Sequence, residues 1–588
     1  MCGIFICARR LQGDPQTFDT TDSSFEKLCI GLRHANAARG PDAQRSHKVS
    51  FKAQASDASM IHLEFFASEL CLRGSRPVVQ PHIRNGDILC WNGEIFEGLD
   101  MAPAENDGVK LFESSRGLKS PAQIRDLFSS VEGPYAFVFH HEESGSLIFG
   151  RDPLGRRSLL IHKPSPSHPY LILTSVTSGA DAGCSFEELS TDHIFYLNLK
   201  DLAQLDDPMT FEDHLKALTR WPSQPTVSSY AEPPKVNPSI PPDTWPRLVS
   251  LDEIPDYLLA SVDALISHLD RSVMLRVHNI PHRSSAPTQS RVAVLFSGGI
   301  DSTVIAYLAH KHIPLEESID LLNVAFENPR KIRMETEGNL GGVSRRHKKK
   351  DKKPSERDPV RVSYMVPDRK TGLQEVEELR QLCPGRTWNF VEVNVPYHES
   401  QGARSIVEAL MLPSRTVMDF SLALALYFAS RGVGHVRAYP GAESVAYTSP
   451  ARVLLNGLGS DELLGGYGRH RSAFNSGGWQ AVISELQLEI QRIPVRNLGR
   501  DDRICSSHGK ETRHPFLSFG VVSFFANLPV QHKMDPRLEV GLGDKMLLRL
   551  AARKMGLIEA SERKKRAMQF GSHSARMEGD AKGDVTLD

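Results

Sequence analysis

The sequence predicts a mainly sheet α+β domain followed by an α/β domain built on an open, mostly parallel sheet. Three observations lead to this fold class. Residues 1–205 contain short β-branched and aromatic runs between turn residues, such as YLILTSV and HIFYLNL, which are typical of strands joined in hairpins. Beyond residue 250, strand-like runs such as RVAVLF alternate with helical patterns, which favours parallel strands with crossover helices. A chain of 588 residues is also too long for one ordinary core.

The composition is that of a globular protein without a strong overall charge. Apolar residues make up 40% and charged residues 24%, and the formal net charge is −1, so nothing in the balance favours a nucleic acid or a membrane surface as partner. No stretch approaches about 20 uninterrupted apolar residues, and we expect no membrane span. Eight cysteines without CxxC or CxxH spacing argue against a zinc site and suit a reducing compartment. The start, MCGIFICARRLQ, lacks the order of charges and apolar residues of a signal peptide, so the cytoplasm is the expected location.

Biased segments separate and interrupt the two domains. Eight prolines between residues 222 and 246 exclude regular helix or central strand and predict a linker. Residues 330–357 hold eleven Lys/Arg against four acids and predict a disordered basic insertion. Its centre, RRHKKKDKK (345–353), leaves nuclear import as an alternative to a solvated loop. The expected boundaries are a first domain at 1–205, a Pro-rich linker at 206–249, a second domain at 250–573 and a polar tail at 574–588.

The second domain should open with a long amphipathic helix. Apolar residues at positions 254, 258, 262, 265, 266 and 269 follow the helical repeat. Ser250 and Glu253, which precede them, have the spacing of a capping box, so we expect the helix to begin at Ser250.

Cys2 is a candidate nucleophile because of its position. Removal of the first methionine would leave it with a free α-amine, whose pKa near ~8 suits a general base for its own thiol. A lone cysteine is more often a buried small hydrophobe. The interpretation therefore depends on the motifs that accompany it.

The segment WNGEIF (91–96) supplies two hydrogen-bond donors that an oxyanion hole needs, the side-chain amide of Asn92 and the backbone N–H of Gly93. Asn-Gly alone is more often a hairpin turn. Here it occurs in order with RGPDA (39–43) and GRDPLGRRSLL (150–160), a combination that chance does not readily explain.

Three charged residues complete this first group. Arg73, in LRG, has the fork that grips a carboxylate, whereas Glu94 and Asp107 have the charge to hold an ammonium group. Taken singly, a surface charge or a helix cap is the simpler interpretation of each. Together, the arginine suits the α-carboxylate of an amino acid and the two acids suit its α-ammonium group.

With these motifs, residues 1–200 resemble class II glutamine amidotransferase domains, which are α+β sandwiches of the N-terminal-nucleophile kind. In that family the processed cysteine attacks the glutamine side-chain amide, ammonia leaves and water then releases glutamate. The resemblance implies Cys2 as the nucleophile, Asn92 and Gly93 as the oxyanion hole, and Arg73, Asn92, Glu94 and Asp107 as the glutamine-binding residues.

A second group of motifs begins with VAVLFSGGIDSTVIAYLA (292–309), which predicts a buried strand, a Ser-Gly-Gly turn and a helix from about Asp301. Two glycines and two hydroxyls at a helix N-terminus form a nest for phosphate oxygens. The GxxxxGK[ST] lysine is absent. The stretch SGGIDS resembles the pyrophosphate loop of ATP pyrophosphatases, which split ATP into AMP and pyrophosphate to adenylate a substrate. A second acid, Asp461, could help to bind Mg²⁺ there.

Together the two halves resemble asparagine synthetase. The stretches PDRKTG (367–372), NGLGSDELLGGY (456–467) and RKKRAMQFGS (563–572) extend the resemblance, and the insertion after residue 329 is similar to that of the asparagine synthetase domain-containing branch. The resemblance implies ATP and Mg²⁺ as cofactors. It implies ATP-binding residues Ser297, Gly298, Gly299, Asp301, Ser302, Val324, Asn456, Gly457 and Lys565, with Asp301 and Asp461 at the metal; Lys564 and Arg566 leave the alignment of Lys565 open.

Two positions depart from the family pattern. Leu458 stands where asparagine synthetases have a glutamate assigned to adenylation and to the attack of ammonia, and Ser518 replaces the acid of PFLD. Proton transfer by a positioned side chain typically contributes ~10²–10⁴-fold, which Leu458 does not supply.

The expected function is glutamine-dependent amidation of aspartate through a β-aspartyl-adenylate. The alternatives are a glutaminase-competent amidotransferase with another acceptor, or a nucleotide-binding regulatory protein without catalysis; an RNA-modifying pyrophosphatase is a weaker option. We expect glutamine, aspartate and ATP as partners, no membrane, no nucleic acid, and a homodimer as the assembly to test.

Overall fold

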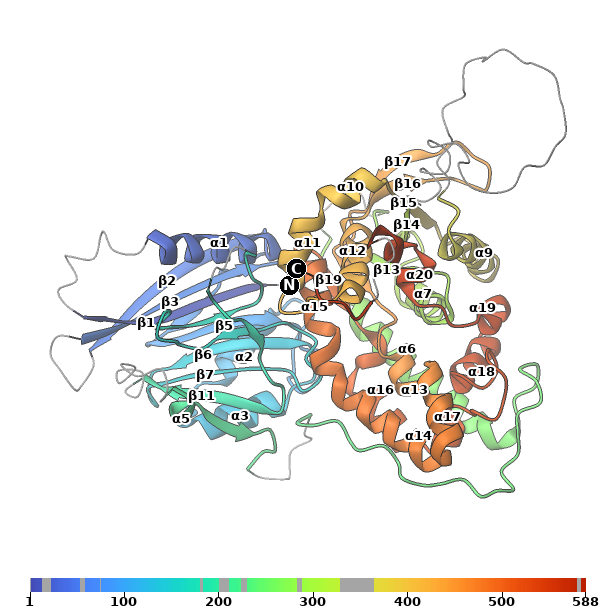
Figure 1. Cartoon of the computed structure of the whole chain (residues 1–588), viewed down its shortest axis with the longest axis horizontal. Helices are drawn as coiled ribbons and strands as arrows, with labels where there is room; N and C mark the ends of the chain where they lie inside the picture. The colour runs from blue at the N-terminus through green and yellow to red at the C-terminus, as the bar shows by residue number, and fades with distance from the viewer. Residues whose placement is uncertain are drawn as a thin grey trace, which may run out of the picture.

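A computed structural model describes residues 2–12, 23–52, 59–74, 76–179, 183–199, 211–223, 230–282, 288–327, 364–578 and 583–587. The basic insertion expected at 330–357, with its segment 345–353, lies outside the described residues. Figure 1 shows a strand-rich N-terminal half beside a C-terminal half in which helices surround a third sheet.

The N-terminal half consists of two six-stranded antiparallel sheets packed face to face. The first has the order β10-β8-β9-β1-β3-β2 and the second β12-β11-β7-β6-β5-β4. Alternating apolar residues of both sheets, such as Ile4, Phe65 and Val138, form the shared core. The strands are β1 (Gly3–Gln12), β2 (Ala43–Lys52), β3 (Ser59–Glu69), β4 (His82–Arg84), β5 (Asp87–Gly93), β6 (Tyr135–His141), β7 (Ser146–Arg151), β8 (Leu160–His162), β9 (Tyr170–Thr174), β10 (Glu187–Glu188), β11 (His193–Asn198) and β12 (Lys216–Thr219).

Helices cover the outer faces of this sandwich. Helix α1 (Ser23–Arg39) packs on β1 and β3, whereas α2 (Asp107–Ser114) and α3 (Pro121–Ser129) cover the second sheet, as Figure 1 shows. Phe128 of α3 packs with Trp91 and Phe137 in this outer core. The layers are therefore helix, sheet, sheet and helix, the α+β arrangement that the strand pattern predicted.

The C-terminal half is built on a seven-stranded sheet of order β17-β16-β15-β14-β13-β18-β19. The strands β15, β14, β13, β18 and β19 run parallel to one another. Strands β16 and β17 add an antiparallel edge. Because both faces of the parallel part are covered by helices, β14 is buried along its whole length. The strands are β13 (Val292–Leu295), β14 (Ile319–Phe326), β15 (Trp388–Val395), β16 (Val433–Val436), β17 (Val445–Thr448), β18 (Val453–Leu455) and β19 (Glu511–Arg513).

The helices of this half lie before, between and after these strands in the chain. They are α6 (Asp256–Val277), α7 (Ile300–His312), α9 (Pro367–Leu382), α10 (Tyr397–Gly402), α11 (Arg404–Met411), α12 (Val417–Arg431), α13 (Ser460–Leu464), α14 (Gly468–Arg496), α15 (Leu498–Ser506), α16 (Phe519–Asn527), α17 (Val530–Lys533), α18 (Met546–Lys554), α19 (Ile558–Glu562) and α20 (Met568–Gly571), with short 3-10 turns η3 (Pro515–Leu517) and η4 (Ser574–Glu578). Helix α7 begins within one residue of the predicted position.

The first helix of this half begins later than predicted. Its apolar stripe is as expected, with Leu258 and Val262 fully buried. However, α6 begins at Asp256 after Pro255, and the Ser250 hydroxyl donates to Asp252 instead of capping a helix. The capping box was wrong because the residue before a proline is disfavoured in the helical region, so Pro255 sets the start.

Two segments expected to lie outside the domains are part of them. Within the expected linker, α5 (Phe211–His214) leads into β12, which pairs with β11 as an edge strand of the second sheet. In the expected tail, the carbonyls of Gly583 and Val585 accept hydrogen bonds from the first N–H groups of α12. The described part of the proline-rich stretch 222–246 contains no helix or strand, as predicted, but the boundaries drawn at residues 206 and 574 were too wide because edge strands and backbone pairing need little apolar sequence.

A buried charge network joins the two halves. Arg39 of α1 pairs with Asp502 of α15 at 2.8 Å, and Arg157 pairs with Glu511 of β19 at 2.9 Å; each of these side chains is at most 2% exposed. Removing one partner of such a pair leaves an uncompensated buried charge. The network therefore fixes how the first sheet sits against the third.

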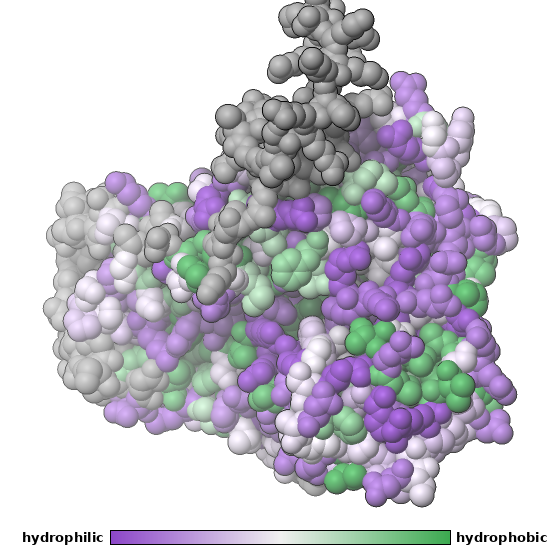
Figure 2. Space-filling model, turned by 45° about the vertical axis from the view of Figure 1, so that its right-hand side comes forward, coloured by the Kyte–Doolittle hydropathy of each residue, from purple (hydrophilic) through white to green (hydrophobic). Residues whose placement is uncertain are grey.

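The surface is mixed in polarity. On the face in Figure 2, hydrophilic side chains separate small groups of hydrophobic ones, as on most globular proteins. Within the described ranges, no helix combines the length and the apolar character needed to cross a membrane.

Candidate active sites

Cys2 lies at the start of β1, facing the end of β5 in the opposite sheet. Its backbone N–H donates to Asn92 Oδ1 at 2.9 Å. Asn92 is fully buried, and its Nδ2 has no hydrogen-bond partner among the described residues. The side-chain amide therefore holds the backbone of Cys2 with one end and presents a free donor with the other.

The thiol of Cys2 is buried, and burial raises its pKa to about 12. A stable thiolate is thus disfavoured, and attack by Sγ needs a base that takes the proton as the new bond forms. Gln80 Nε2 lies 3.6 Å from Sγ, while Gln80 Oε1 accepts from the Trp91 N–H. Sequence reasoning missed Gln80, since nothing in its local sequence marks a loop residue that folds back onto Cys2.

The charged residues expected to bind glutamine lie together. Arg73 Nε donates to Glu94 Oε1 at 2.7 Å, and Glu94 Oε2 also lies 3.3 Å from Arg513 of β19 in the other half. Asp107 accepts from the N–H groups of Ile95 and Gly108. Burial raises the pKa of Asp107 to about 7, with Glu94 adding to the shift. One cation and two acids thus face the same region.

The residues expected at the ATP site line one cleft of about 870 Å³ in the C-terminal half. The cleft opens at the carboxyl ends of β13, β14 and β18, where ligands bind in open α/β sheets. Gly298 has a φ of +73°, and a Cβ there would meet Gly372 of α9. The lining includes Ser297, Gly298, Gly299, Asp301, Ser302, Val324, Asn456, Gly457, Asp461 and Lys565.

Lys545 brings a buried ammonium group to the cleft beside the Ser-Gly-Gly turn. Its Nζ lies 2.7 Å from Asp301 Oδ2 and 2.7 Å from Asp461 Oδ1, and it donates to Ser460 Oγ. Lys565 also pairs with Asp461. Burial opposes ionisation of Asp461, but the two lysines outweigh it and hold the pKa of that carboxyl below its ordinary range. Sequence reasoning missed Lys545 because only the packing of α18 against the loop brings it to the cleft.

Asp301 and Asp461, the two carboxylates expected to bind Mg²⁺, suit this ion only when a nucleotide supplies further ligands. Among the described residues, no group of three or more His, Cys, Asp or Glu side chains could hold a metal ion. Asp301 and Asp461 converge, but both now contact Lys545. Mg²⁺ is usually held by one or two carboxylates together with substrate phosphates. The donor set therefore suits an ion that arrives with a nucleotide, rather than a site formed by protein alone.

Further charged groups lie around the same cleft. Burial raises the pKa of Asp368 to about 7, against the opposing charges of Arg566 and Lys565. Arg500, which also lines the cleft, pairs with Asp419 and Asp501. The cleft thus offers both signs of charge to an acceptor with an amino and a carboxylate group.

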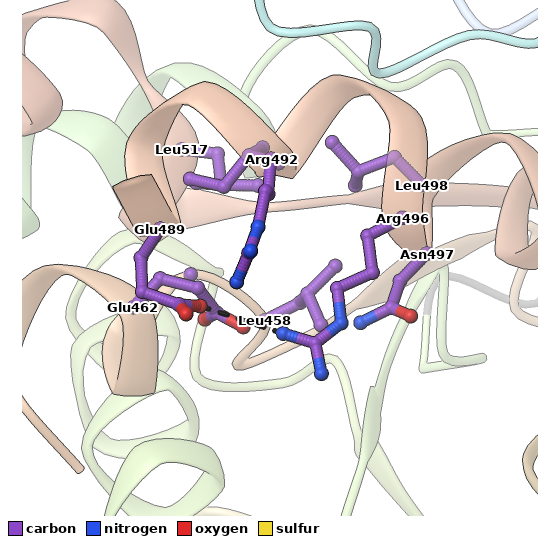
Figure 3. Close-up of a pocket in the computed structure, with 10 residues that line it drawn as sticks. Leu458, Glu462, Glu489, Arg492, Arg496, Asn497, Leu498 and Leu517 are labelled. Atoms are coloured by element: carbon purple, nitrogen blue, oxygen red, sulfur yellow. Dashed lines mark hydrogen bonds and ion pairs between the residues drawn. The ribbon is translucent and has the colours of Figure 1, made fainter. Parts of the chain in front are cut away.

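Leu458 and Ser518, the two departures from the family pattern, have different surroundings. Leu458 lines both the large cleft and a small neighbouring cavity, and Figure 3 shows it among the residues of the small cavity. Near Leu458, the carboxylate of Glu462 accepts a hydrogen bond from the Tyr467 hydroxyl at 2.5 Å. Ser518 caps α16 by accepting from the Val521 N–H. Serine and aspartate are comparable helix caps, so we expect that replacement to be nearly neutral.

Comparisons with known proteins show which families the chain resembles. The asparagine synthase family model matches residues 474–585. Asparagine synthetase domain-containing protein 1 of Homo sapiens is 36% identical over 98% of this chain and 96% of its own, and that of Gallus gallus is 37% identical over 84% and 87%. An asparagine synthetase domain-containing protein of Saccharomyces cerevisiae is 31% identical over 96% and 91%. Among solved structures, the allosteric regulatory enzyme of purine biosynthesis covers 55% of this chain and 66% of its own, with 14% identity and a TM-score of 0.25, too low to carry an argument.

Proposed function

The chain belongs to the family of asparagine synthetase domain-containing proteins, and from this premise we propose that it is a glutamine-hydrolysing, ATP-dependent amidotransferase that converts aspartate to asparagine. The N-terminal half would be the class II glutaminase, of the N-terminal-nucleophile kind, and the C-terminal half the ATP pyrophosphatase.

The glutaminase step would use the residues around Cys2. After removal of Met1, the α-amine takes the thiol proton while Sγ attacks the side-chain carbonyl carbon of glutamine. Asn92 Nδ2 and the Gly93 N–H would donate to the oxyanion. The amine returns the proton to the leaving nitrogen, ammonia departs, and water then cleaves the thioester to release glutamate.

The synthetase step would take place in the large cleft. The aspartate β-carboxylate attacks the α-phosphorus of ATP and pyrophosphate leaves, held by the loop from Ser297 to Ser302 and by Lys545. Asp301 and Asp461 would help to hold a Mg²⁺ ion that arrives with ATP, and the ion would neutralise phosphate charge. Ammonia then attacks the acyl carbon, AMP leaves with the bonding electron pair, and the nitrogen passes one proton to the departing phosphate or to water.

One observation carries the proposal. The side-chain oxygen of Asn92 accepts a hydrogen bond from the backbone N–H of Cys2, and the buried Nδ2 of the same side chain has no partner among the described residues. An unsatisfied buried donor costs roughly 1–3 kcal/mol. An oxyanion formed on substrate is a partner that would offset that cost only during the reaction.

The test is a product assay on the purified full-length protein. With ATP, Mg²⁺, aspartate and glutamine we expect equal amounts of pyrophosphate and asparagine, together with glutamate. Cys2→Ala should abolish the use of glutamine and spare synthesis from ammonium chloride. Loss of both activities in Cys2→Ala would contradict the assignment of two separate sites.

A second candidate, a glutaminase with a different acceptor, is favoured by Leu458. This side chain stands at the cleft wall where a carboxylate would assist ammonia, so amidation of aspartate should be slow. Glutamate release without asparagine would support this candidate. If Leu458→Glu leaves asparagine formation unchanged, the residue at this position does not limit the reaction.

A further inference from the structure

Two lysines of the large cleft bind the same carboxylate. Lys545 Nζ lies 2.7 Å from Asp461 Oδ1, and Lys565 Nζ pairs with the other oxygen, Oδ2. Lys545 directly precedes α18 and Lys565 follows α19, two helices that lie side by side (Figure 1). The two ammonium groups therefore meet only if other contacts hold these two segments of the chain in one arrangement.

Arg549 of α18 contacts both segments. Its Nε donates to the carbonyl oxygen of Asp544 at 2.7 Å and its Nη2 donates to Asp544 Oδ2 at 2.6 Å, at the residue before the first lysine. Its Nη1 donates to the carbonyl oxygens of Ser561 and Arg563 at 2.7 and 2.9 Å, shortly before the second lysine. The Arg549 side chain is 1% exposed. Because the guanidinium is planar and rigid, these bonds fix the two segments relative to each other.

The backbone at Lys545 is held in an unfavourable conformation. Its φ of +52° lies in the left-handed region, which crowds the Cβ of any residue other than glycine. Such a conformation persists where neighbouring contacts impose it. The bonds from Arg549 to Asp544 lie directly before this residue, and the Lys545 carbonyl accepts from the Arg549 N–H at 3.0 Å. Arg549 thus holds the turn from which the Lys545 side chain reaches the cleft.

The segment before Lys565 has a second anchor, on α9. Arg563 Nε donates to Glu375 Oε1 at 2.6 Å, and the Glu375 side chain is fully buried. Glu378 of the same helix accepts from the N–H groups of Glu559 and Ala560 at the start of α19. These contacts attach the segment to α9, whereas Arg549 attaches it to the segment that carries the other lysine.

We propose that Arg549 is a positioning residue that sets the spacing of Lys545 and Lys565, so that both ammonium groups engage neighbouring phosphates of one bound nucleoside triphosphate. The inference rests on the proposed function, because that function assigns ATP to this cleft. Two cations held at a fixed spacing lose less side-chain freedom when they bind adjacent phosphates than two independent lysines would. Arg549 itself acts through the lysines and needs no contact with the nucleotide.

The binding test compares Arg549→Lys with Arg553→Lys in the full chain by titration calorimetry. Lysine keeps the positive charge beside Asp544 but loses the fork that reaches the two carbonyl oxygens. Arg553, one turn later on α18, pairs with Asp252 and Glu562 and is the matched control. With α,β-methylene-ATP and Mg²⁺, Arg549→Lys should raise Kd about tenfold, the loss expected for one charge-assisted hydrogen bond. An unchanged Kd, or an equal rise in Arg553→Lys, would overturn the proposal.

A cycle of two variants separates positioning from a general effect on the fold. Lys565→Met removes one phosphate contact and should itself raise Kd about tenfold. If Arg549 acts by placing this lysine, Arg549→Lys should raise Kd less in the Lys565→Met chain than in the wild-type chain. Equal rises in both backgrounds would mean that Arg549 only stabilises the fold, and would refute its positioning role.

The wild-type chain distinguishes failure of this inference from failure of the proposed function. Nucleotide binding with the expected losses but without asparagine formation would support the role of Arg549 and overturn the proposed function. Asparagine formation with a Kd that Arg549→Lys leaves unchanged would overturn the inference alone. A wild-type chain that binds no nucleotide would overturn both.

Discussion

Replacing Asp502 by asparagine would test whether the buried charge network holds the two halves together. The Asp502 carboxylate is 1% exposed, lies 2.8 Å from Arg39 and 3.5 Å from Arg157, and accepts from the Ser158 N–H. Burial opposes its ionisation, but the two arginines outweigh burial and lower its pKa below the ordinary 3.8. Because Arg39 also donates to the Cys2 carbonyl, the pair links α15 to the nucleophile.

The size of the effect follows from burial. Removing one partner of a buried ion pair typically costs about 3–5 kcal/mol. Asparagine keeps the shape and one acceptor of aspartate, so we expect a loss of about 3 kcal/mol, a large share of the ~5–15 kcal/mol that stabilises a domain. The asparagine leaves Arg39 and Arg157 with less opposing charge, and glutamine hydrolysis should fall as the Cys2 backbone loosens.

Urea unfolding of wild type and variant, followed by tryptophan fluorescence, measures the loss. The control is Asp263→Asn, whose exposed pair with Lys554 should contribute under about 1 kcal/mol. Because folding lowers the pKa of Asp502, its carboxylate stabilises the folded chain above pH 3.8, and this stabilisation is lost as pH falls further. The free energies of unfolding of wild type and Asp502→Asn should therefore converge in acid. An Asp502→Asn chain as stable at pH 7 as the Asp263→Asn chain would refute the reasoning.

Three further predictions follow from the two sites and the C-terminal segment. Burial raises the pKa of Asp107 to about 7, so KM for glutamine should rise as pH falls from 8 to 6, and Asp107→Asn should remove that dependence; a flat wild-type profile would contradict the role. Lys545→Met should lower ATP-dependent pyrophosphate release about 100-fold while leaving glutamine hydrolysis intact, measured in parallel assays. Ending the chain at residue 578 removes the carbonyls bound by the N–H groups of Val417 and Met418, and we expect a loss of about 1–2 kcal/mol in a thermal melt; an unchanged midpoint would argue against a structural role.

The local parts of both sites were predictable from sequence. The Ser-Gly-Gly turn after β13 and the Asn-Gly end of β5 lie where the strand patterns placed them, because the strand, the turn and the residues that follow are continuous in the chain. The same holds for the buried stripe of α6. Only its start was misjudged, because the stiffness of Pro255 outweighed the capping pattern.

Contacts between distant segments were decided by the tertiary structure alone. Lys545 reaches Asp301 across 244 positions and Gln80 reaches Cys2 across 78, and no local pattern encodes either approach. The sequence by itself determined which chemical groups the chain carries and which short loops present them. Only packing of the sheets and helices decided which charges neutralise one another and which polar atoms stay free, because these depend on distances that a one-dimensional pattern does not contain.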